Sequence, residues 1–560
     1  MKNLIVAICQ INSIVGDLNG NASKILNFYK KASELYQPDL ILFPECSLVG
    51  YPPEDLLMRE SFIKMNQDVL NKIAKKIHGP VAVIGFIHKK ADALFNSAAV
   101  IEDCKIKMIY SKRFLPNYGV FDEKRYFTPG YNKGIVQIKG VSVGLSICED
   151  MWIEQDKRLD HDQLIIDKSP VMEQSELGAK LLVNISASPF YAGKFKVRYE
   201  LLKKWVHKTK CPMIFANLVG GQDELVFDGR SMVVDKTGKL VVVGKSFQED
   251  IQCVQIQFHG SEPVCFPMSD GKTVIPETKI QEIYSALVLG TRDYIEKNGF
   301  QNVIVGLSGG IDSALTACIA VDAIGKTRVT GVTMPSRYSS KATKMDAKKL
   351  AQNLGIKFLS IPIEQIFKSF LNILSPAFKG TKPNLTEENL QSRIRGTILM
   401  ALSNKFGYLV LTTGNKSEIS VGYCTLYGDT AGGFAVLKDV PKTVVYKLSE
   451  YVNSLSQKTL IPKTTILRAP TAELRPNQKD QDTLPSYGIL DQIIHGYVEE
   501  DQSYKKLLRK GINFNVLTKI LKMIDQNEYK RRQSPPGVKI TPKSFGKDRR
   551  MPITNRFTEV

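Results

Sequence analysis

Seven residues near the middle of the chain, LSGGIDS at 307–313, have the composition of a phosphate-binding turn. Gly309 and Gly310 leave backbone N–H groups free to converge on an anion, and a helix expected directly after them would present its positive end to the same point. The largely apolar residues 302–306 predict a buried strand before the turn. A Walker loop needs a lysine that this segment lacks, which argues against ordinary kinase or GTPase chemistry. The alternative is a glycine turn that serves packing alone.

Three segments of the first half carry a carboxylate, an amine and a thiol at or just after apolar runs: Glu45 in FPECSLVGY, Lys112 in YSKRFLPNYG and Cys148 in GLSICEDMW. Side chains at strand ends commonly meet in one site. A cysteine must lose its proton to become a nucleophile, and a nearby carboxylate can accept that proton. A lysine and a backbone N–H can stabilise the oxyanion that follows. The set therefore predicts amide hydrolysis through a thioester on Cys148, whereas Cys46 is interpreted as a core residue.

The segment LSGGIDS resembles the pyrophosphatase loop of ATP enzymes that cleave between the α and β phosphates and transfer AMP to a substrate oxygen. The positions that match are Ser308, Gly309, Gly310, Asp312 and Ser313. The resemblance implies that the loop holds the departing pyrophosphate and that Asp312 helps to bind Mg²⁺. GMP synthetase, asparagine synthetase and tRNA-modifying ligases share this loop, so it leaves open which acid is activated.

Residues 412–448, TTGNKSEISVGYCTLYGDTAGGFAVLKDVPKTVVYKL, are similar to the NAD synthetase domain, and the resemblance covers most of residues 280–550. It implies that ATP adenylylates the nicotinate carboxylate of deamido-NAD and that ammonia then displaces AMP to give NAD. The implied roles are ATP contacts for Met334 and Thr413, a magnesium site at Asp312 and Glu418, and substrate or phosphate contacts for Arg395, Asp429, Lys442 and Lys547. Taken without the resemblance, Glu418 and Asp429 are typical of a solvated helix and a turn, and Arg395 and Lys547 of surface charges.

Residues 1–265 resemble the nitrilase superfamily, on the Glu45, Lys112 and Cys148 set and its flanking residues. The resemblance implies that Glu45 is the general base and that Glu123, in FDEKRYF, orients Lys112 or the attacking water. It also implies a glutamine-binding group of Tyr118, Trp152, Ser188 and Lys194. Lys194 stands where an arginine is expected to contact the glutamine carboxylate.

Apolar runs alternate with amphipathic stretches in both halves, which predicts an α/β protein of two domains. The first, residues 1–265, is expected to be a nitrilase-like domain with α/β/β/α layers. A linker is predicted at 266–279, where FPMSDGKTVIPETK has two prolines and no hydrophobic period. Residues 280–560 are expected to form a doubly wound parallel sheet, Rossmann-like and of the ATP pyrophosphatase type, with a basic tail after Gln526 that is interpreted as loop.

The composition is that of a soluble globular protein, with 43% apolar and 24% charged residues among 560. Nine scattered cysteines without a CxxC pair favour the reducing cytoplasm over a zinc site or a disulfide framework. The net charge of +20 would suit nucleic acid, but the lysines are spread along the whole chain. The expected partners are ATP, Mg²⁺, glutamine and deamido-NAD in a homo-oligomer, with neither nucleic acid nor membrane.

Two other functions stay open from the sequence. One is another glutamine amidotransferase or a tRNA-modifying ligase that uses the same ATP loop. The other is a non-catalytic assembly or nucleotide-sensing protein, which would have no physical need for either residue set. Because ammonia in water is largely protonated, the two-site interpretation also predicts a protected passage from Cys148 to the activated acid.

Overall fold

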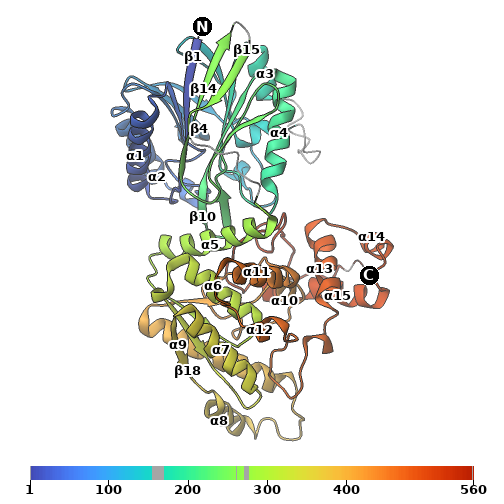
Figure 1. Cartoon of the computed structure of the whole chain (residues 1–560). Coiled ribbons are helices and arrows are strands. Elements are labelled where there is room, and N and C mark those ends of the chain that lie inside the picture. The colour runs from blue at the N-terminus through green and yellow to red at the C-terminus, as the bar shows by residue number, and fades with distance from the viewer. Residues whose placement is uncertain (1, 154–168, 260–261, 270–276, 558, 560) are drawn as a thin grey trace. The chain divides into compact units, whose positions relative to one another are not determined.

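The computed structural model describes residues 2–153, 169–259, 262–269, 277–557 and 559. The chain divides into two compact units, Met1–Pro276 and Glu277–Val560 (Figure 1). Strand β15 (Glu262–Pro267) pairs with β14 (Asp250–His259), so the sheet runs two residues into the segment expected as linker. Residues 270–276 of that expected linker lie outside the described residues.

Two sheets form the centre of the first unit, with strand orders β15-β14-β1-β2-β3-β4-β5 and β13-β12-β9-β8-β7-β6. The remaining strands of the first sheet are β1 (Lys2–Gln10), β2 (Leu40–Leu42), β3 (Val81–Lys90), β4 (Ala93–Glu102) and β5 (Lys105–Ser111). Those of the second are β6 (Ile135–Ile138), β7 (Val141–Ile147), β8 (Leu181–Ser186), β9 (Met213–Asn217), β12 (Met232–Val234) and β13 (Leu240–Val243). A separate hairpin joins β10 (Val219–Gln222) to β11 (Leu225–Asp228).

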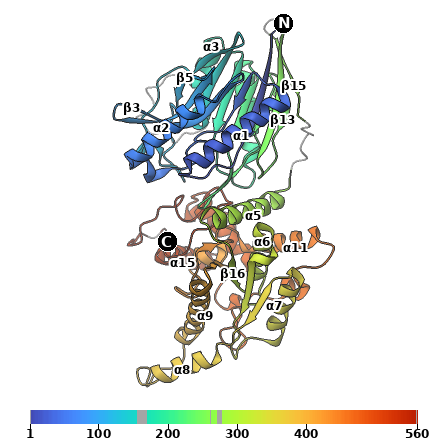
Figure 2. The ribbon, with the colours of Figure 1, turned by 90° about the vertical axis from the view of Figure 1, so that its left-hand side faces the viewer.

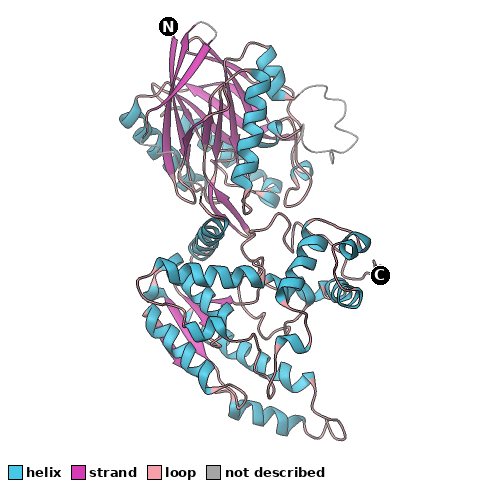
Figure 3. Cartoon of the chain, turned by 45° about the vertical axis from the view of Figure 1, so that its right-hand side comes forward, coloured by secondary structure: helices cyan, strands magenta, loops and turns pink. Residues whose placement is uncertain are grey.

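The two sheets pack face to face because alternate side chains along each strand point to opposite sides. In β1, Val6 contributes to the apolar cluster between the sheets, together with Val183 of β8, whereas Ala7 belongs to the cluster under the helices on the outer face. Those helices are α1 (Leu18–Tyr36) and α2 (Glu60–Ala74), and α3 (Pro170–Glu176) and α4 (Lys194–Thr209) cover the second sheet. Figure 3 shows the strands gathered between these helices. The predicted α/β/β/α layers are confirmed.

The second unit is built on a five-stranded, entirely parallel sheet in the order β18-β17-β16-β19-β20. Its strands are β16 (Val303–Gly306), β17 (Val329–Thr333), β18 (Lys357–Ser360), β19 (Leu409–Thr412) and β20 (Phe434–Ala435). The chain winds outward from β16 in one direction and returns to its other side at β19. Ligands of such sheets bind where the strand order reverses, beyond the carboxyl ends of the strands. The doubly wound fold is confirmed, and it places the loops after β16 and β19 side by side.

Helices cover both faces of this sheet. Figure 2 shows α6 and α7 to one side of β16 and α9 to the other. The larger helices are α5 (Lys279–Lys297), α6 (Ile311–Ile324), α7 (Lys341–Leu354), α8 (Glu364–Leu374), α9 (Leu385–Phe406), α11 (Lys442–Leu455), α13 (Tyr487–Ile494) and α15 (Phe514–Gln526). The shorter ones are α10 (Lys416–Val421), α12 (Lys463–Leu467), α14 (Tyr504–Arg509) and α16 (Glu528–Arg531). None of the helices in the described ranges is long and apolar enough to cross a membrane.

The tail after Gln526 is not loop throughout, as the sequence interpretation had it. Helix α16 forms there because Glu528, inside an otherwise basic stretch, pairs with Arg531 and Arg532 one turn on, at 3.0 Å each. These pairs offset the repulsion of the basic residues, so the segment folds back onto the unit.

Candidate active sites

The first candidate site joins Glu45, Lys112 and Glu123, which follow β2, β5 and a loop. Lys112 Nζ lies 2.8 Å from Glu45 Oε1 and 2.8 Å from Glu123 Oε1, and all three side chains are buried. Burial alone would lower the pKa of Lys112, but Glu123 and Glu45 hold it well above its ordinary value. The lysine is therefore a fixed cation between two carboxylates.

Cys148 directly follows β7 and begins a short 3-10 helix, Cys148–Met151. Its φ of 40° lies in the left-handed region, which a residue with a side chain adopts only when its surroundings require it. Burial and the neighbouring Glu45 raise the pKa of the thiol well above its ordinary value. The resting group is thus a protonated thiol that needs a base, and Glu45 belongs to the same buried group of charges.

The Glu45 carboxylate is fixed by contacts that the sequence did not reveal. Asn96, on β4, donates a hydrogen bond to Oε1 at 2.7 Å, and the backbone N–H of Ala187 donates to Oε2 at 2.7 Å. The turn that carries Glu45 lies so close to β3 that a Cβ on Gly85 would approach the Cys46 nitrogen to 2.4 Å. No strand was predicted around Asn96, so nothing in the sequence pointed to this residue.

Two of the residues expected to bind glutamine contact each other, and a third contacts Glu149. Tyr118 donates a hydrogen bond to Glu149 at 3.0 Å, and the Lys194 ammonium lies 4.1 Å from the centre of the Trp152 ring. Burial raises the pKa of Glu149, the residue after the candidate nucleophile, to about 7. Sequence reasoning had assigned this carboxyl no role.

Ser188 completes the expected glutamine-binding group and is held through its backbone. Its N–H donates to Asn217 Oδ1 at 3.0 Å, and its carbonyl accepts from the buried Arg198 at 3.4 Å. Arg198 is in turn paired with Asp228 at 2.7 Å. Segments from β9, α4 and β11 therefore fix the position of Ser188.

The second candidate site is the turn after β16, where the chain passes through Ser308, Gly309 and Gly310 into α6. Gly309 has a φ of 85°, and a Cβ there would lie 2.2 Å from the carbonyl oxygen of Thr343, so this position requires glycine. The Ser313 hydroxyl donates to the Gly310 carbonyl at 2.9 Å and lies 3.2 Å from the Ser308 hydroxyl. The turn opens onto a cavity of about 320 Å³ at the point where the strand order reverses.

Two carboxylates face one lysine in the wall of this cavity. Lys442 Nζ lies 2.5 Å from Asp312 and 3.0 Å from Glu418. Burial, with Asp312 beside it, raises the pKa of Glu418 to about 7. Both carboxylates remain 18% exposed, so they are open to the cavity. The oxygens of Asp312 and Glu418 therefore converge on a point that already holds a positive charge.

The cavity brings together nearly all the residues expected to bind ATP and substrate. Its lining includes Ser308, Gly309, Gly310, Asp312, Ser313, Met334, Arg395, Thr413, Glu418, Asp429 and Lys442. Arg395 donates to the Met334 carbonyl at 3.0 Å, and burial lowers the pKa of this guanidinium to about 10, so it stays charged at neutral pH. Lys547 is not in the described lining and lies in the C-terminal segment, where its assigned role stays a prediction.

The structure adds residues to the cavity wall that sequence reasoning missed. Arg468 donates to the Gly309 carbonyl at 3.1 Å, and Glu473 accepts from the Thr343 hydroxyl at 2.9 Å, so residues 468–474 lie over the phosphate turn. Asn415 donates to Asp312 Oδ1 at 2.9 Å. Asp480 also lines the cavity and accepts from Tyr487 at 2.7 Å. The Asn415 contact could have been suspected, since N-cap asparagines lie at helix starts.

Comparison with known proteins assigns the two units to two families. Residues 5–264 match the carbon-nitrogen hydrolase family, and residues 283–534 match the NAD synthase family. The glutamine-dependent NAD(+) synthetases of Thermotoga maritima and Aquifex aeolicus are 44% and 45% identical to the chain, over 100% of each protein. The chain belongs to the glutamine-dependent NAD(+) synthetase family. A solved structure of the glutamine-dependent NAD+ synthetase from Acinetobacter baumannii, in complex with ADP, is 40% identical over 100% of both chains with a TM-score of 0.78.

Membership in the glutamine-dependent NAD(+) synthetase family confirms the resemblance seen in the sequence of each half. It also separates this chain from tRNA-modifying ligases, because the relatives it matches over their full length are glutamine-dependent NAD(+) synthetases. The shared ATP loop alone could not have made that distinction.

Proposed function

We propose that this chain makes NAD from deamido-NAD, with ATP for activation and glutamine as the nitrogen source. The observation that carries the proposal is the cavity at the reversal of strand order, where an anion-binding turn faces two carboxylates and a lysine. Cleavage of a nucleoside triphosphate is favoured by anion-binding and cationic groups of this kind, because negative charge develops on the pyrophosphate as it leaves.

In the proposed glutamine reaction, Cys148 Sγ bonds to the side-chain amide carbon of glutamine while Glu45 takes the thiol proton. Lys112 and a backbone N–H stabilise the oxyanion. The carbon–nitrogen bond then breaks, and Glu45 returns the proton to the departing ammonia. Water attacks the thioester carbon and gives a proton to Glu45. The carbon–sulfur bond then breaks, glutamate leaves, and Glu45 returns the proton to Cys148 Sγ. Glu123 keeps Lys112 oriented through both steps.

In the proposed activation, a nicotinate carboxylate oxygen bonds to the α-phosphorus of ATP, and the bond from that phosphorus to pyrophosphate breaks. Ser308, Gly309, Gly310 and Ser313 hold the pyrophosphate, and Lys442 offsets its charge. Ammonia then bonds to the carboxyl carbon, the bond from that carbon to the AMP oxygen breaks, and a proton passes from the nitrogen to solvent. The products are AMP and the amide. Met334 and Thr413 contact ATP, while Arg395, Asp429 and Lys547 contact the dinucleotide.

Asp312 and Glu418 are proposed to hold Mg²⁺. Their oxygens converge on one cationic point, and Mg²⁺ is commonly bound by one or two carboxylates together with substrate phosphates. When bound, the ion would neutralise phosphate charge. With the ion bound to the two carboxylates, Lys442 would contact phosphate instead of Asp312 and Glu418.

Ammonia is proposed to pass from Cys148 to the activated acid without entering bulk water, because the protonated form cannot attack. We also place the enzyme in the cytoplasm, where its nine free thiols would stay reduced, and expect it to act as a homo-oligomer. Light scattering of the purified protein tests the last point.

The deciding experiment mixes the protein with Mg²⁺, ATP and deamido-NAD without any nitrogen source, and measures inorganic pyrophosphate. The expected result is release of pyrophosphate, with an adenylylated dinucleotide visible by mass spectrometry. A parallel reaction with bulk tRNA in place of deamido-NAD should release none. Pyrophosphate release with tRNA alone, or with neither acid, contradicts the proposal.

A further inference from the structure

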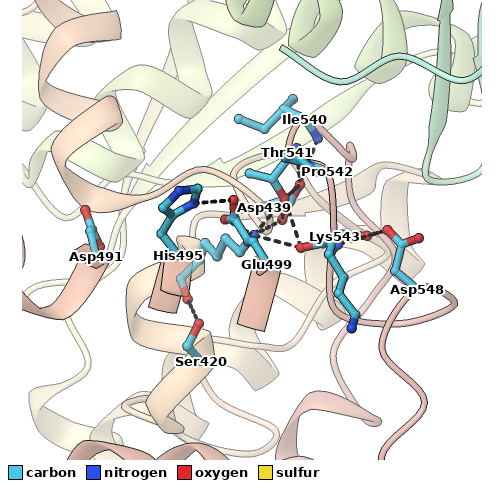
Figure 4. A network of polar contacts seen from close by, with 12 residues as sticks. Ser420, Asp439, Asp491, His495, Glu499, Ile540, Thr541, Pro542, Lys543 and Asp548 are labelled. Carbon is cyan, nitrogen blue, oxygen red and sulfur yellow. Dashed lines mark hydrogen bonds and ion pairs between the residues drawn. The ribbon is translucent and has the colours of Figure 1, made fainter. Parts of the chain in front are cut away.

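A buried charged cluster lies next to the ATP cavity but outside the residues assigned so far. Its centre is Lys416, the first residue of α10, whose side chain is 0% exposed. The Nζ lies 2.7 Å from Glu499 Oε1, 2.9 Å from Asp439 Oδ1 and 2.7 Å from Thr541 Oγ1. Figure 4 shows Asp439, Glu499 and Thr541 grouped around this point. Four groups of this cluster come from four separate stretches of the chain.

Each charged group of the cluster has an ion-pair or hydrogen-bond partner. Burial alone would lower the pKa of Lys416, but Asp439 and Glu499 raise it, so the ammonium stays charged. Asp439 Oδ2 also accepts from the backbone N–H groups of Ile540 and Thr541 at 2.8 and 2.7 Å. Burying this many charges has a high desolvation cost, which excellent geometry can offset but a plain apolar core would avoid. Such a cluster therefore suggests a role in specifying position.

Three of the four stretches that meet at Lys416, all but the one with Glu499, continue into the cavity wall. On α10, Asn415 precedes Lys416 and bonds to Asp312, and Glu418 follows two residues later. Asp439 comes three residues before Lys442, whose backbone N–H donates to Ser417 at 2.8 Å.

The C-terminal stretch reaches the wall as well. Residues 534 and 535, only six residues before Thr541, line the cavity. The Ala435 N–H donates to the Pro536 carbonyl at 2.8 Å, and Lys438 Nζ donates to the Pro535 carbonyl at 2.7 Å. The segment thus runs beside the chain that leads to Lys442.

We propose that Lys416 is a positioning residue for the adenylylation site, which holds α10, the approach to Lys442 and the C-terminal segment in one fixed arrangement. The inference rests on the function proposed above. Lys416 touches none of the residues assigned to substrate contact through its side chain, and it acts through the backbone of its neighbours. Its loss lets Glu418 and Lys442 move relative to Asp312, and a displacement of about 1 Å can lower a rate by about 10²-fold.

The test compares two substitutions of lysines that form ion pairs in the second unit. Lys416→Met removes the central ammonium and keeps nearly the length of the side chain. Lys297→Met is the control, because Lys297 pairs with Asp293 at 3.4 Å within α5, its side chain is only 13% exposed, and neither residue lines the cavity. Both variants are assayed for NAD formation with ammonium salt at saturating deamido-NAD, with kcat and the KM for ATP determined separately.

We expect Lys416→Met to lower kcat by about 10²-fold and to raise the KM for ATP, whereas Lys297→Met changes kcat less than about threefold. Hydrogen exchange of the amides in residues 415–422 should accelerate in the first variant and not in the second. Equal losses in both variants, or a Lys416→Met enzyme with wild-type kcat and exchange, overturn the proposal.

A second variant covers the case in which Lys416→Met does not fold. The double variant Lys416→Met with Glu499→Gln removes one charge of each sign. The remaining buried carboxylate, Asp439, keeps its hydrogen bonds from two backbone N–H groups. This double variant should fold and still show the reduced kcat. Recovery of wild-type kcat would mean that Lys416 only balances charge, which contradicts a positioning role. If the wild-type protein itself releases no pyrophosphate with deamido-NAD, the proposed function fails instead.

Discussion

The two candidate sites share a motif, one lysine between two carboxylates, but place it in different surroundings. Lys112 lies 2.8 Å from each of its partners, and neither the lysine nor Glu45 has any exposed side-chain surface. Lys442 makes similar contacts, yet Asp312 and Glu418 each keep 18% of their side-chain surface open to the cavity. The first arrangement is therefore complete and fixed, which suits repeated proton transfer. The second is open on one side, which suits a lysine that exchanges carboxylates for the phosphates of an incoming nucleotide.

The largest expected effect separates the two sites by nitrogen source. Cys148→Ala should lower glutamine-dependent NAD formation by about 10⁴-fold or more, as loss of a nucleophile does, and leave the ammonium-dependent rate within about twofold. Both rates are measured by NAD formation. Cys211→Ala, a buried thiol of the same unit, is the control and should keep both activities. A parallel fall of both rates in Cys148→Ala would mean that the sites do not divide the reaction as proposed.

Asp312→Ala should lower NAD formation from either nitrogen source by about 10³-fold, the upper range for loss of one electrostatic contact in a transition state. Glutamate release from glutamine should persist, since it needs only the first site. Asp322→Ala on the same helix removes a carboxylate that contacts Tyr284 and does not line the cavity, and its rates should remain near those of the wild type. If Asp312→Ala lost NAD formation from glutamine but kept NAD formation from ammonium, the second site would not serve both nitrogen sources as proposed.

Asn96→Ala tests how far glutamine hydrolysis depends on the hydrogen bond that holds the Glu45 carboxylate in position. Removing one hydrogen bond to the Glu45 carboxylate at 2.7 Å should reduce glutaminase kcat by about 10- to 100-fold, from about 1.5–3 kcal/mol for a bond to a charged group. Ammonium-dependent NAD formation should not change. Asn66→Ala removes another buried asparagine of that unit, bonded to the Ile87 carbonyl, and should leave glutaminase kcat unaltered. Similar losses in both variants would show a general effect on folding.

The smallest expected effect is a dependence on pH at the second site. Burial raises the pKa of Glu418 to about 7, so the carboxyl gains a proton as the pH falls below neutrality. Its ionised fraction falls about tenfold between pH 8 and pH 6 by simple titration. The rate of exchange between ATP and labelled pyrophosphate, with deamido-NAD present, should fall by about that factor. A flat profile across this interval would show that the ionised form of Glu418 is not required.

The sequence predicted most of the strands that carry the candidate residues, because each is a short apolar run ended by a turn. They include β2 before Glu45, β7 before Cys148 and β16 before the phosphate turn. Strand β5, which precedes Lys112, was missed, since KIKMIYS alternates polar and apolar residues over a length that also fits other structures. Strand β4 was missed as well, although most of its residues are apolar. Family and fold were confirmed, whereas the roles of individual residues stay predictions.

What the sequence could not reveal are contacts between distant segments. Asn96 and Glu45 are 51 positions apart, and Lys416 and Thr541 are 125 apart. No local period or turn signal records such a pair. Glu149 was overlooked for another reason, because a carboxyl beside a nucleophile reads as surface charge until its burial is known. Motif reading therefore identified side chains that could take part in chemistry and missed those that hold them in place.

The contribution of residues 534 and 535 to the cavity wall has a consequence for biosynthesis. Polypeptides emerge from the ribosome from the N-terminus onward, and domains fold in that order. The glutamine-hydrolysing unit is continuous over Met1–Pro276, so it can fold while the rest is still being translated. The nucleotide site is finished only after the chain has passed Thr541. A message truncated in between yields a protein that can still break down glutamine but has no complete site in which to use the nitrogen.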